Sequence, residues 1–212
     1  MRGGGDGFRA IGGSFSEDGL NAAPLNASVF NNIATGNTGF GFRLNGPGAT
    51  TGNIATANAR GGFLIAPGNA TFSSNSAIGN GGPGVIVDFS LDGNPQNVGD
   101  PVPAFHAFNH NNIYGNDRNR PVFALIPETD GEPPYNPGPG AHCGVLNVGE
   151  LSGPGDLEGT PHPGNPVQLS ANDNFWGSTR GPSPTGPGDA VGGVCDQNNG
   201  MTIVKTFATA SL

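Results

Sequence analysis

The side chains best suited to chemistry are three aspartates and one arginine in the first half of the chain. Asp88, Asp92 and Asp100 occupy one segment, and Arg43 lies earlier. Grouped carboxylates bind calcium, and an arginine takes the proton beside a uronate carboxylate in a polysaccharide lyase. We take these four residues as a candidate site for acidic glycans. Their spacing does not repeat, so turn capping and exposure to solvent are the simpler explanation of the aspartates.

The rest of the chain shows no catalytic arrangement. His106 and His110 are four residues apart, a spacing that places two side chains on one face of an α-helix but not of a chain that turns between short strands. The Asn-Thr-Asp, Asp-Asp and Gly-His-Gly motifs that would supply the carboxylates of a polysaccharide hydrolase are also missing. We therefore expect no catalytic residue, no metal site and no cofactor, and calcium enters only if the glycan site exists.

Composition argues against several classes of protein. The chain has 212 residues, of which 39 are Gly and 20 are Pro, and this content leaves no stretch for a helical bundle. The net charge is −8 with only eight Lys and Arg, which argues against nucleic acid because phosphate binding needs clustered cations. No apolar run reaches the roughly 20 residues that a transmembrane helix needs, so we expect no membrane span.

A pair of asparagines five residues apart returns along the chain, followed each time by apolar residues. The four copies are Asn32 to Asn37, Asn53 to Asn58, Asn75 to Asn80, and Asn111 to Asn116. Successive copies start 21, 22 and 36 residues apart, so the last step contains an insertion. A period of this length indicates a solenoid, whose coils stack on one another.

Alternation within each copy assigns side chains to the inside of the coil in three columns. The columns are Ala34, Ala55, Ala77 and Ile113, then Phe40, Phe63, Val85 and Val122, and then Phe42, Ile65, Val87 and Ala124. Short strands that recur in the same order pair in parallel with their counterparts in the next coil. The sequence therefore predicts an all-β, single-stranded parallel β-helix with coils of 21 to 22 residues and long loop insertions.

The asparagines have a structural explanation in such a fold. Asn tolerates the left-handed backbone of a sharp corner, and stacked Asn amides hydrogen-bond to each other along the axis. We expect a turn ladder without a ligand role, made of Asn37, Asn58, Asn80 and Asn116.

The chain divides into a regular part and a loop-rich part of the same domain. Residues 1–126 contain the coils, with a first coil that starts halfway, and residues 127–212 contain the final coils and a C-terminal cap. Loops carry binding residues more often than regular elements do. The expected functional loops are the insertions at residues 88–104, 127–140 and 153–165.

Two cysteines, Cys143 and Cys195, lie 52 positions apart in the C-terminal third. They either pair with each other or remain free thiols. Pairing is favoured because spare cysteines are scarce in exported repeat proteins, and closing this loop would destabilise the unfolded chain by roughly 4 kcal/mol.

The C-terminal third carries a motif that resembles a known family. It runs from Leu169 to Ser178 as Leu-Ser-Ala-Asn-Asp-Asn-Phe-Trp-Gly-Ser, followed by Gly181-Pro182 and Gly188-Asp-Ala-Val191. This pattern is similar to the closing segment of bacterial secreted right-handed parallel β-helix repeat proteins, of the pectate-lyase-like superfamily. The resemblance implies a right-handed helix and an extracellular or cell-surface location. It also implies a cap of Phe175, Trp176 and Gly177, and a disulfide between Cys143 and Cys195 that flanks the motif.

These features favour a non-enzymatic extracellular module that serves as a structural or surface scaffold. The incomplete first coil would expose strand edges, which proteins normally cover. The expected cover is either earlier coils or the cap end of a second copy, and the second option would join copies head to tail into a filament. The alternative function is binding or lyase-like cleavage of acidic glycans at the candidate site.

Overall fold

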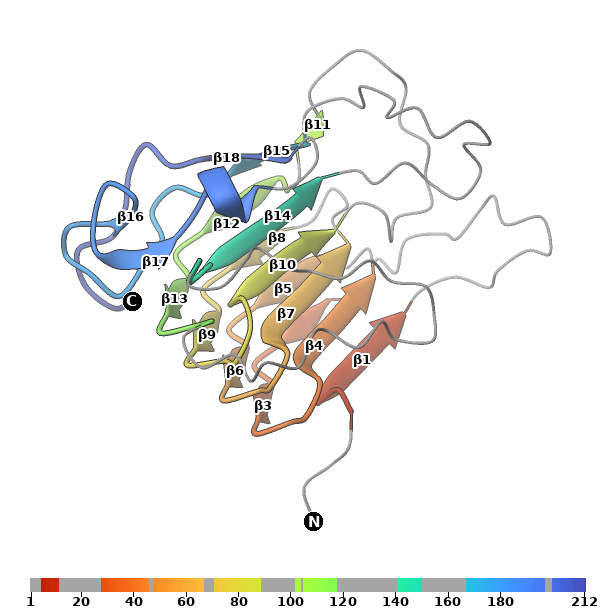
Figure 1. The fold of residues 1–212 in the computed structure, drawn as a ribbon. Helices are drawn as coiled ribbons and strands as arrows, with labels where there is room; N and C mark the ends of the chain where they lie inside the picture. Colours follow the sequence, from red (N-terminus) through yellow and green to blue (C-terminus); the bar gives the residue numbers. More distant parts are fainter. Residues whose placement is uncertain are drawn as a thin grey trace, which may run out of the picture.

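Strands from successive coils pair in parallel and form three walls around one axis (Figure 1). This arrangement is seen in a computed structural model. It describes residues 5–11, 28–45, 48–66, 71–88, 102–103, 105–117, 141–149, 167–196 and 200–212. The predicted all-β parallel β-helix is confirmed.

The walls differ in length. The long wall contains β1 (Phe8–Ile11), β4 (Phe40–Asn45), β7 (Gly61–Ala66), β10 (Val85–Asp88) and β14 (Val145–Gly149). The second wall contains β2 (Val29–Phe30), β5 (Ala49–Thr51), β8 (Thr71–Ser73) and β12 (Ala107–Asn109). The third wall contains β3 (Ile33–Thr35), β6 (Ile54–Thr56), β9 (Ser76–Ile78) and β13 (Asn112–Tyr114). Ile33 pairs with Ile54, and Ile54 with Ser76, so these coils have the predicted lengths of 21 and 22 residues.

The C-terminal elements follow the last coil. One short sheet contains β11 (Val102–Pro103), β15 (Val167–Ser170) and β18 (Gly200–Ile203). A further pair is β16 (Pro182–Ser183) with β17 (Gly188–Ala190), and a 3-10 turn, η2, spans Gly193–Cys195. β16 and β17 lie at the opposite end of the molecule from β1 and β3 (Figure 1).

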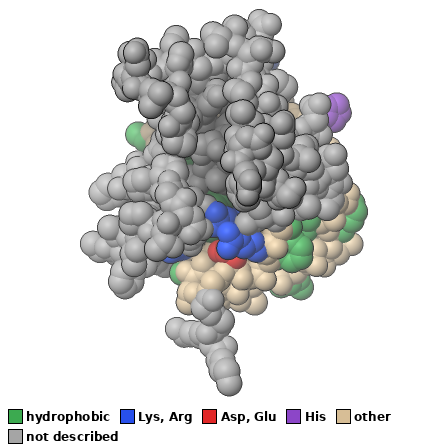
Figure 2. All heavy atoms as spheres, turned by 90° about the vertical axis from the view of Figure 1, so that its right-hand side faces the viewer, with side chains coloured by type: hydrophobic (Ala, Val, Ile, Leu, Met, Phe, Trp, Pro, Cys, Tyr) green, Lys and Arg blue, Asp and Glu red, His purple; other side chains and the backbone are tan. Residues whose placement is uncertain are grey.

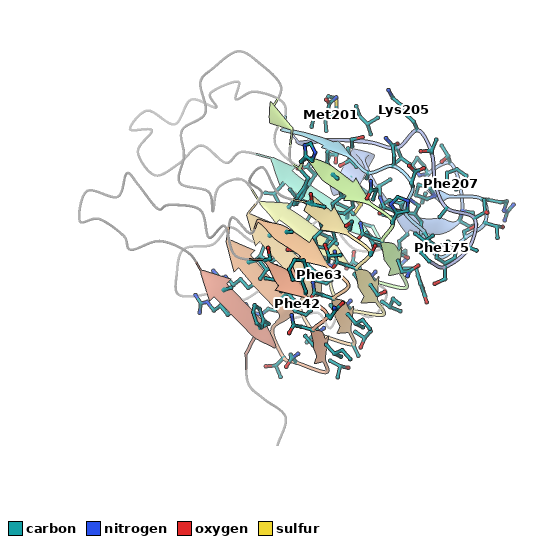
Figure 3. All side chains as sticks on the ribbon, turned by 180° about the vertical axis from the view of Figure 1, so that it is seen from behind. Phe42, Phe63, Phe175, Met201, Lys205 and Phe207 are labelled. Atoms are coloured by element: carbon teal, nitrogen blue, oxygen red, sulfur yellow. A yellow bond between two sulfur atoms is a disulfide. The ribbon has the colours of Figure 1, made fainter. Side chains whose placement is uncertain are left out.

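Apolar columns fill the inside of the coils, because alternate residues of a strand point to the same face. The predicted first column of Ala34, Ala55, Ala77 and Ile113 is buried. Phe42 stacks on Phe63 with ring centroids 4.8 Å apart, and Phe63 meets Phe72 of the second wall edge to face at 5.1 Å. Figure 3 shows Phe42 and Phe63 between the walls.

The predicted second and third columns were wrong in register. The observed columns are Phe42, Phe63, Val85 and Val145, and then Leu44, Ile65 and Val87. Phe40 aligns instead with Gly61. The asparagine repeat fixes this register, since Phe42 and Phe63 each follow the second asparagine of their pair by five residues, whereas Phe40 follows Asn37 by three. The predicted members Val122 and Ala124 lie outside the described residues.

The opposite face of the long wall is apolar as well. Leu64, Ile86 and Leu146 are buried there in a second cluster that includes Phe40. Cys143 and Cys195 belong to the same cluster and form a disulfide, which confirms the predicted pairing. In β7 and β10 both faces are buried, which explains the continuous apolar runs Phe63-Leu64-Ile65 and Val85-Ile86-Val87.

Residues with left-handed backbone stack in two columns at the corners on either side of the third wall. The corner before the wall has Asn31, Gly52, Ser74, His110 and Asp173, and the corner after it has Gly36, Ala57, Gly79 and Gly115. The asparagines of the repeat directly follow these residues and do not share their positive φ. The prediction that the ladder asparagines occupy the left-handed corner was therefore wrong, because the preceding residue makes the turn.

Most of the predicted insertions fall outside the described residues. Of the first insertion, the structure describes Asp88 and the two residues of β11. The segments 127–140 and 153–165, and the division at residue 126, lie outside the described ranges.

Candidate functional site

Two lines of polar side chains run along the axis, one at each corner of the third wall. The first ladder contains Asn32, Asn53, Asn75, Asn111 and Asn174. The second ladder contains Asn37, Asn58, Asn80, Asn116 and Asp189. All of these side chains are buried except those of Asn32 and Asn37, which are half-buried. The four asparagines of the predicted turn ladder are consecutive members of the second ladder.

The same hydrogen bonds recur at each step of the ladders. In the second ladder, the backbone N–H and Nδ2 of Asn58 both donate to Oδ1 of Asn80 at 3.0 Å. Nδ2 of Asn58 also donates to the carbonyl oxygen of Ala34 at 3.1 Å, and its Oδ1 accepts two bonds from Asn37. A side-chain amide has two donor hydrogens and an oxygen with two lone pairs, so this arrangement uses its whole capacity. The interior steps leave no amide group for a ligand.

Both ladders have a direction. In every bond that ends on a ladder side-chain oxygen, the donor belongs to the earlier coil and the accepting oxygen to the later coil. The two ends of each ladder are therefore chemically different. At the beginning, Oδ1 of Asn32 and Oδ1 of Asn37 accept no hydrogen bond within the part of the chain that the structure describes.

Asp189 closes the second ladder. Its Oδ2 accepts hydrogen bonds from the backbone N–H and Nδ2 of Asn116 at 2.9 and 3.1 Å, and its Oδ1 accepts the N–H of Gly115 at 3.0 Å. A carboxylate accepts hydrogen bonds without donating any, so its side chain cannot donate to a further coil and the ladder ends here. Sequence reasoning missed this role. The available signal was the Gly188-Asp189 pair, which matches Gly36-Asn37 with an acid in place of the amide.

Asn174 closes the first ladder from within the predicted cap. Its Oδ1 accepts both donors of Asn111, and its Nδ2 donates to the carbonyl oxygens of Phe108 and Asn172 at 3.2 and 3.0 Å. Both amide hydrogens therefore bond to the chain's own backbone. Sequence reasoning did not connect Asn174 with the repeat, although it follows Asp173 as Asn111 follows His110.

The three residues of the predicted cap have different environments. Trp176 continues the inward column after Ile113, because Asn112 pairs with Phe175, and it is fully buried. A buried indole offers no platform to a sugar ring. Phe175 meets Tyr114 edge to face at 5.6 Å. Gly177 has φ 81°, and a Cβ there would lie 2.6 Å from Cβ of Tyr114, so a larger residue does not fit.

The N-terminal end of the stack is formed by β1, β2 and β3, the first strands of the three walls. β1 lies one coil ahead of β4, whereas β2 and β3 have no partner on that side among the described residues. Phe8, Phe30 and Ile33 are 37%, 52% and 70% exposed at this end. Free strand edges beside exposed apolar side chains are typical of a surface that binds another chain.

The candidate glycan site is described only in part. Arg43 lies on β4 with 7% of its surface exposed, and its register partner on β1 is Arg9. Asp88 ends β10 in the same wall, and Asp92 and Asp100 lie outside the described residues. Figure 2 shows blue Lys and Arg atoms gathered beside red Asp or Glu atoms on this side of the molecule. The neighbouring Arg9 was not singled out from the sequence.

One carboxyl near the disulfide has altered acidity. Asp196 directly follows η2, and the N–H and hydroxyl of Thr202 donate to it at 2.8 and 2.6 Å. Burial raises the pKa of Asp196 above its ordinary value of 3.8, although the hydrogen bonds from Thr202 lower it in part. The charged form of this group is therefore costly in the folded chain.

The described residues contain no cluster of three or more His, Cys, Asp or Glu side chains placed to hold a metal ion. Within the same residues there is also no helix whose length and apolar character would suit a membrane crossing.

Comparison with known proteins gives no match to a family model, to a curated protein or to a solved structure. The class of the protein therefore follows from its own fold and its two ladders. It is a parallel β-helix solenoid whose coils are joined by hydrogen-bonded asparagines.

Proposed function

We propose that this chain is a non-enzymatic scaffold module of an extracellular or cell-surface protein, and that it docks end-on with another β-coil. The observation that carries the proposal is the N-terminal end, where β2 and β3 have edges without a partner among the described residues, beside Phe30 and Ile33. The ladders and the Phe42–Phe63 stack support a rigid rod, because every coil is tied to the next by the same bonds.

The disulfide supports the extracellular part of the proposal, because such bonds persist in oxidising compartments. The cap motif supports a relationship with bacterial secreted pectate-lyase-like β-helix proteins. Within this motif, Asn174 ends the first ladder, Trp176 ends the inward column and Asp189 ends the second ladder. On this proposal the motif closes the helix and has no catalytic role.

Head-to-tail association into filaments is one form of the proposal. Size-exclusion chromatography and electron microscopy at rising concentration test it, with Ile33→Lys at the N-terminal end as the disruptive variant. Ile54→Lys is the matched control, since Ile54 is 37% exposed on β6 and has a paired strand on each side. Fibres that Ile33→Lys abolishes and Ile54→Lys preserves support the filament. A monomer at all concentrations eliminates this form.

The second candidate function is binding or cleavage of acidic glycans, and the pairing of Arg9 with Arg43 favours it. Two arginines on adjacent parallel strands suit a chain of carboxylates. The test incubates the protein with a panel of uronate polymers, with and without calcium, and follows binding and the absorbance of unsaturated product. Binding that an Arg9→Gln/Arg43→Gln variant loses, and an Arg180→Gln variant keeps, would favour this function. Unsaturated product would overturn the non-enzymatic proposal. Neither binding nor product with any polymer of the panel would support it.

A further inference from the structure

We infer that the N-terminal end of the stack accepts one kind of partner, an uncapped parallel β-coil that carries the asparagine pair. The inference rests on the proposed function, since it names the partner of the end-on docking. Its basis is the direction of the two ladders. Each ladder Oδ1 accepts from the coil before it, so a coil placed ahead of Asn32 and Asn37 must supply the donors to their Oδ1 atoms.

The donors required are specific. Within the stack, Oδ1 of each ladder asparagine after the first accepts a backbone N–H and an Nδ2 from the coil before. Asn32 and Asn37 are the first members of the two ladders, so their Oδ1 atoms are equivalent to these acceptors. Neither of the two Oδ1 atoms receives those bonds within the described residues. A partner that fits both must present two carboxamides five residues apart, one on each side of a short parallel strand, because that is how Asn32 and Asn37 flank β3.

A second copy of this chain does not offer those donors at its other end. There the second ladder ends in the Asp189 carboxylate, which has no hydrogen to give. The first ladder ends in Asn174, whose Nδ2 already donates to Phe108 and Asn172. Figure 3 shows Phe175 and Phe207 at this end, away from Phe42 and Phe63. The ladder side chains at the C-terminal end of one copy therefore cannot supply the donors that Oδ1 of Asn32 and Oδ1 of Asn37 in another copy would accept.

The apolar surface agrees with a coil as the occupant. Phe8 is the outermost member of the aromatic column, with its ring centroid 5.8 Å from that of Phe42. Exposed Phe30 lies on β2 and exposed Ile33 on β3, so the apolar residues lie on the edges that an additional coil would cover. Parallel strand addition would pair the edges and cover part of these side chains, since Ile54, which has a strand on each side, is 37% exposed where Ile33 is 70% exposed.

The test supplies such a coil within the full chain. Gly39 lies one coil after Gly5, because its N–H donates to the carbonyl oxygen of Gly5 and Phe8 pairs with Phe42. Replacing residues 1–4 with a second copy of residues 28–38 therefore places a new asparagine pair one coil ahead of Asn32 and Asn37. We expect the thermal midpoint to rise, and amide exchange of β3 to slow.

The matched control is the same extension with its two ladder asparagines changed to aspartate, which keeps their size and removes the amide donors. We expect the asparagine extension to melt about 5 °C above the aspartate extension, from the lost hydrogen bonds at two sites. Equal melting temperatures would overturn the inference. Head-to-tail oligomers of the unmodified chain that Ile33→Lys abolishes would also overturn it, because the cap end would then be the partner. An active glycan lyase would refute the proposed function without changing the result for the extension.

Discussion

At the residue scale, the left-handed corners show where the backbone itself limits the choice of residue. In the column after the third wall, Gly36, Gly79 and Gly115 share their position with one alanine, Ala57, whose φ is 54°. An L-residue in this region costs about 1–2 kcal/mol, because Cβ approaches the following carbonyl oxygen. Ala57 is therefore a local source of strain in an otherwise regular column.

Replacing this alanine should stabilise the chain. We expect Ala57→Gly to raise the free energy of unfolding by about 0.5 to 1 kcal/mol, the relief of strain being partly offset by the greater entropy of glycine in the unfolded chain. Ala59→Gly is the control, since Ala59 is exposed and has no positive φ. Urea denaturation should show opposite signs for the two variants, and a loss of stability in both would contradict the strain argument.

Asp196 links stability to pH. Because burial raises its pKa, the folded chain holds this proton more tightly than the unfolded chain does. The resulting stabilisation is fully present below the unfolded value of 3.8 and is lost as pH rises through the higher folded pKa.

The variant Asp196→Asn removes this titration. We expect its free energy of unfolding to improve relative to the unmodified chain as pH rises from about 4 to 7, because only the unmodified chain then acquires a buried charge. Urea denaturation at several pH values measures the difference between the two proteins. Parallel pH profiles would show that Asp196 does not titrate differently on folding.

At the element scale, the ladders hold the corners of successive coils together. Each interior asparagine bridges three coils, as Asn58 does between Asn37, Asn80 and the carbonyl of Ala34. Buried polar groups that lose their partners are costly, so these bonds matter more for what their removal exposes than for their net energy. The ladders also impose the register, since they fix the distance from each corner to the next strand.

Asn58→Ala should therefore destabilise the chain by about 3 kcal/mol. The change leaves the two donors of Asn37 and the carbonyl oxygen of Ala34 without their hydrogen-bond partner. Asn109→Ala is the matched control. Asn109 is a half-buried asparagine on β12 whose side chain makes no hydrogen bond in the described part of the chain, and we expect a change within about 0.5 kcal/mol. Chemical denaturation compares the two. Similar losses would mean that the ladder bonds contribute little.

At the scale of the whole molecule, the two ends of the stack are built differently. The C-terminal end closes both ladders, buries Trp176 and ties Cys143 to Cys195. Among the described residues, the N-terminal end has unpaired edges at β2 and β3, exposed apolar side chains, and the Oδ1 atoms of Asn32 and Asn37, which accept no hydrogen bond there. This asymmetry supports the proposed end-on docking.

The disulfide should contribute strongly to that closed end, because it links residues 52 positions apart. We expect Cys143→Ser/Cys195→Ser to lower the free energy of unfolding by about 4 kcal/mol on the chain-entropy estimate. Denaturation of the unmodified chain with and without reductant is the companion measurement. Free energies should be compared, because opening the loop also expands the unfolded state and changes the denaturant slope. Equal stability in all three samples would refute the prediction.

The sequence by itself determined the parallel β-helix, the coil length and the inward column of Ala34, Ala55, Ala77 and Ile113. These follow from alternation and period, which are local properties of the chain. The tertiary structure alone decided that Val145 follows Val85 in the long wall, and that Asn174 and Asp189 close the ladders. Those contacts join Asn111 to Asn174 and Asn116 to Asp189 across 63 and 73 positions. Such contacts depend on how the intervening insertions return to the stack, and no local spacing encodes that path.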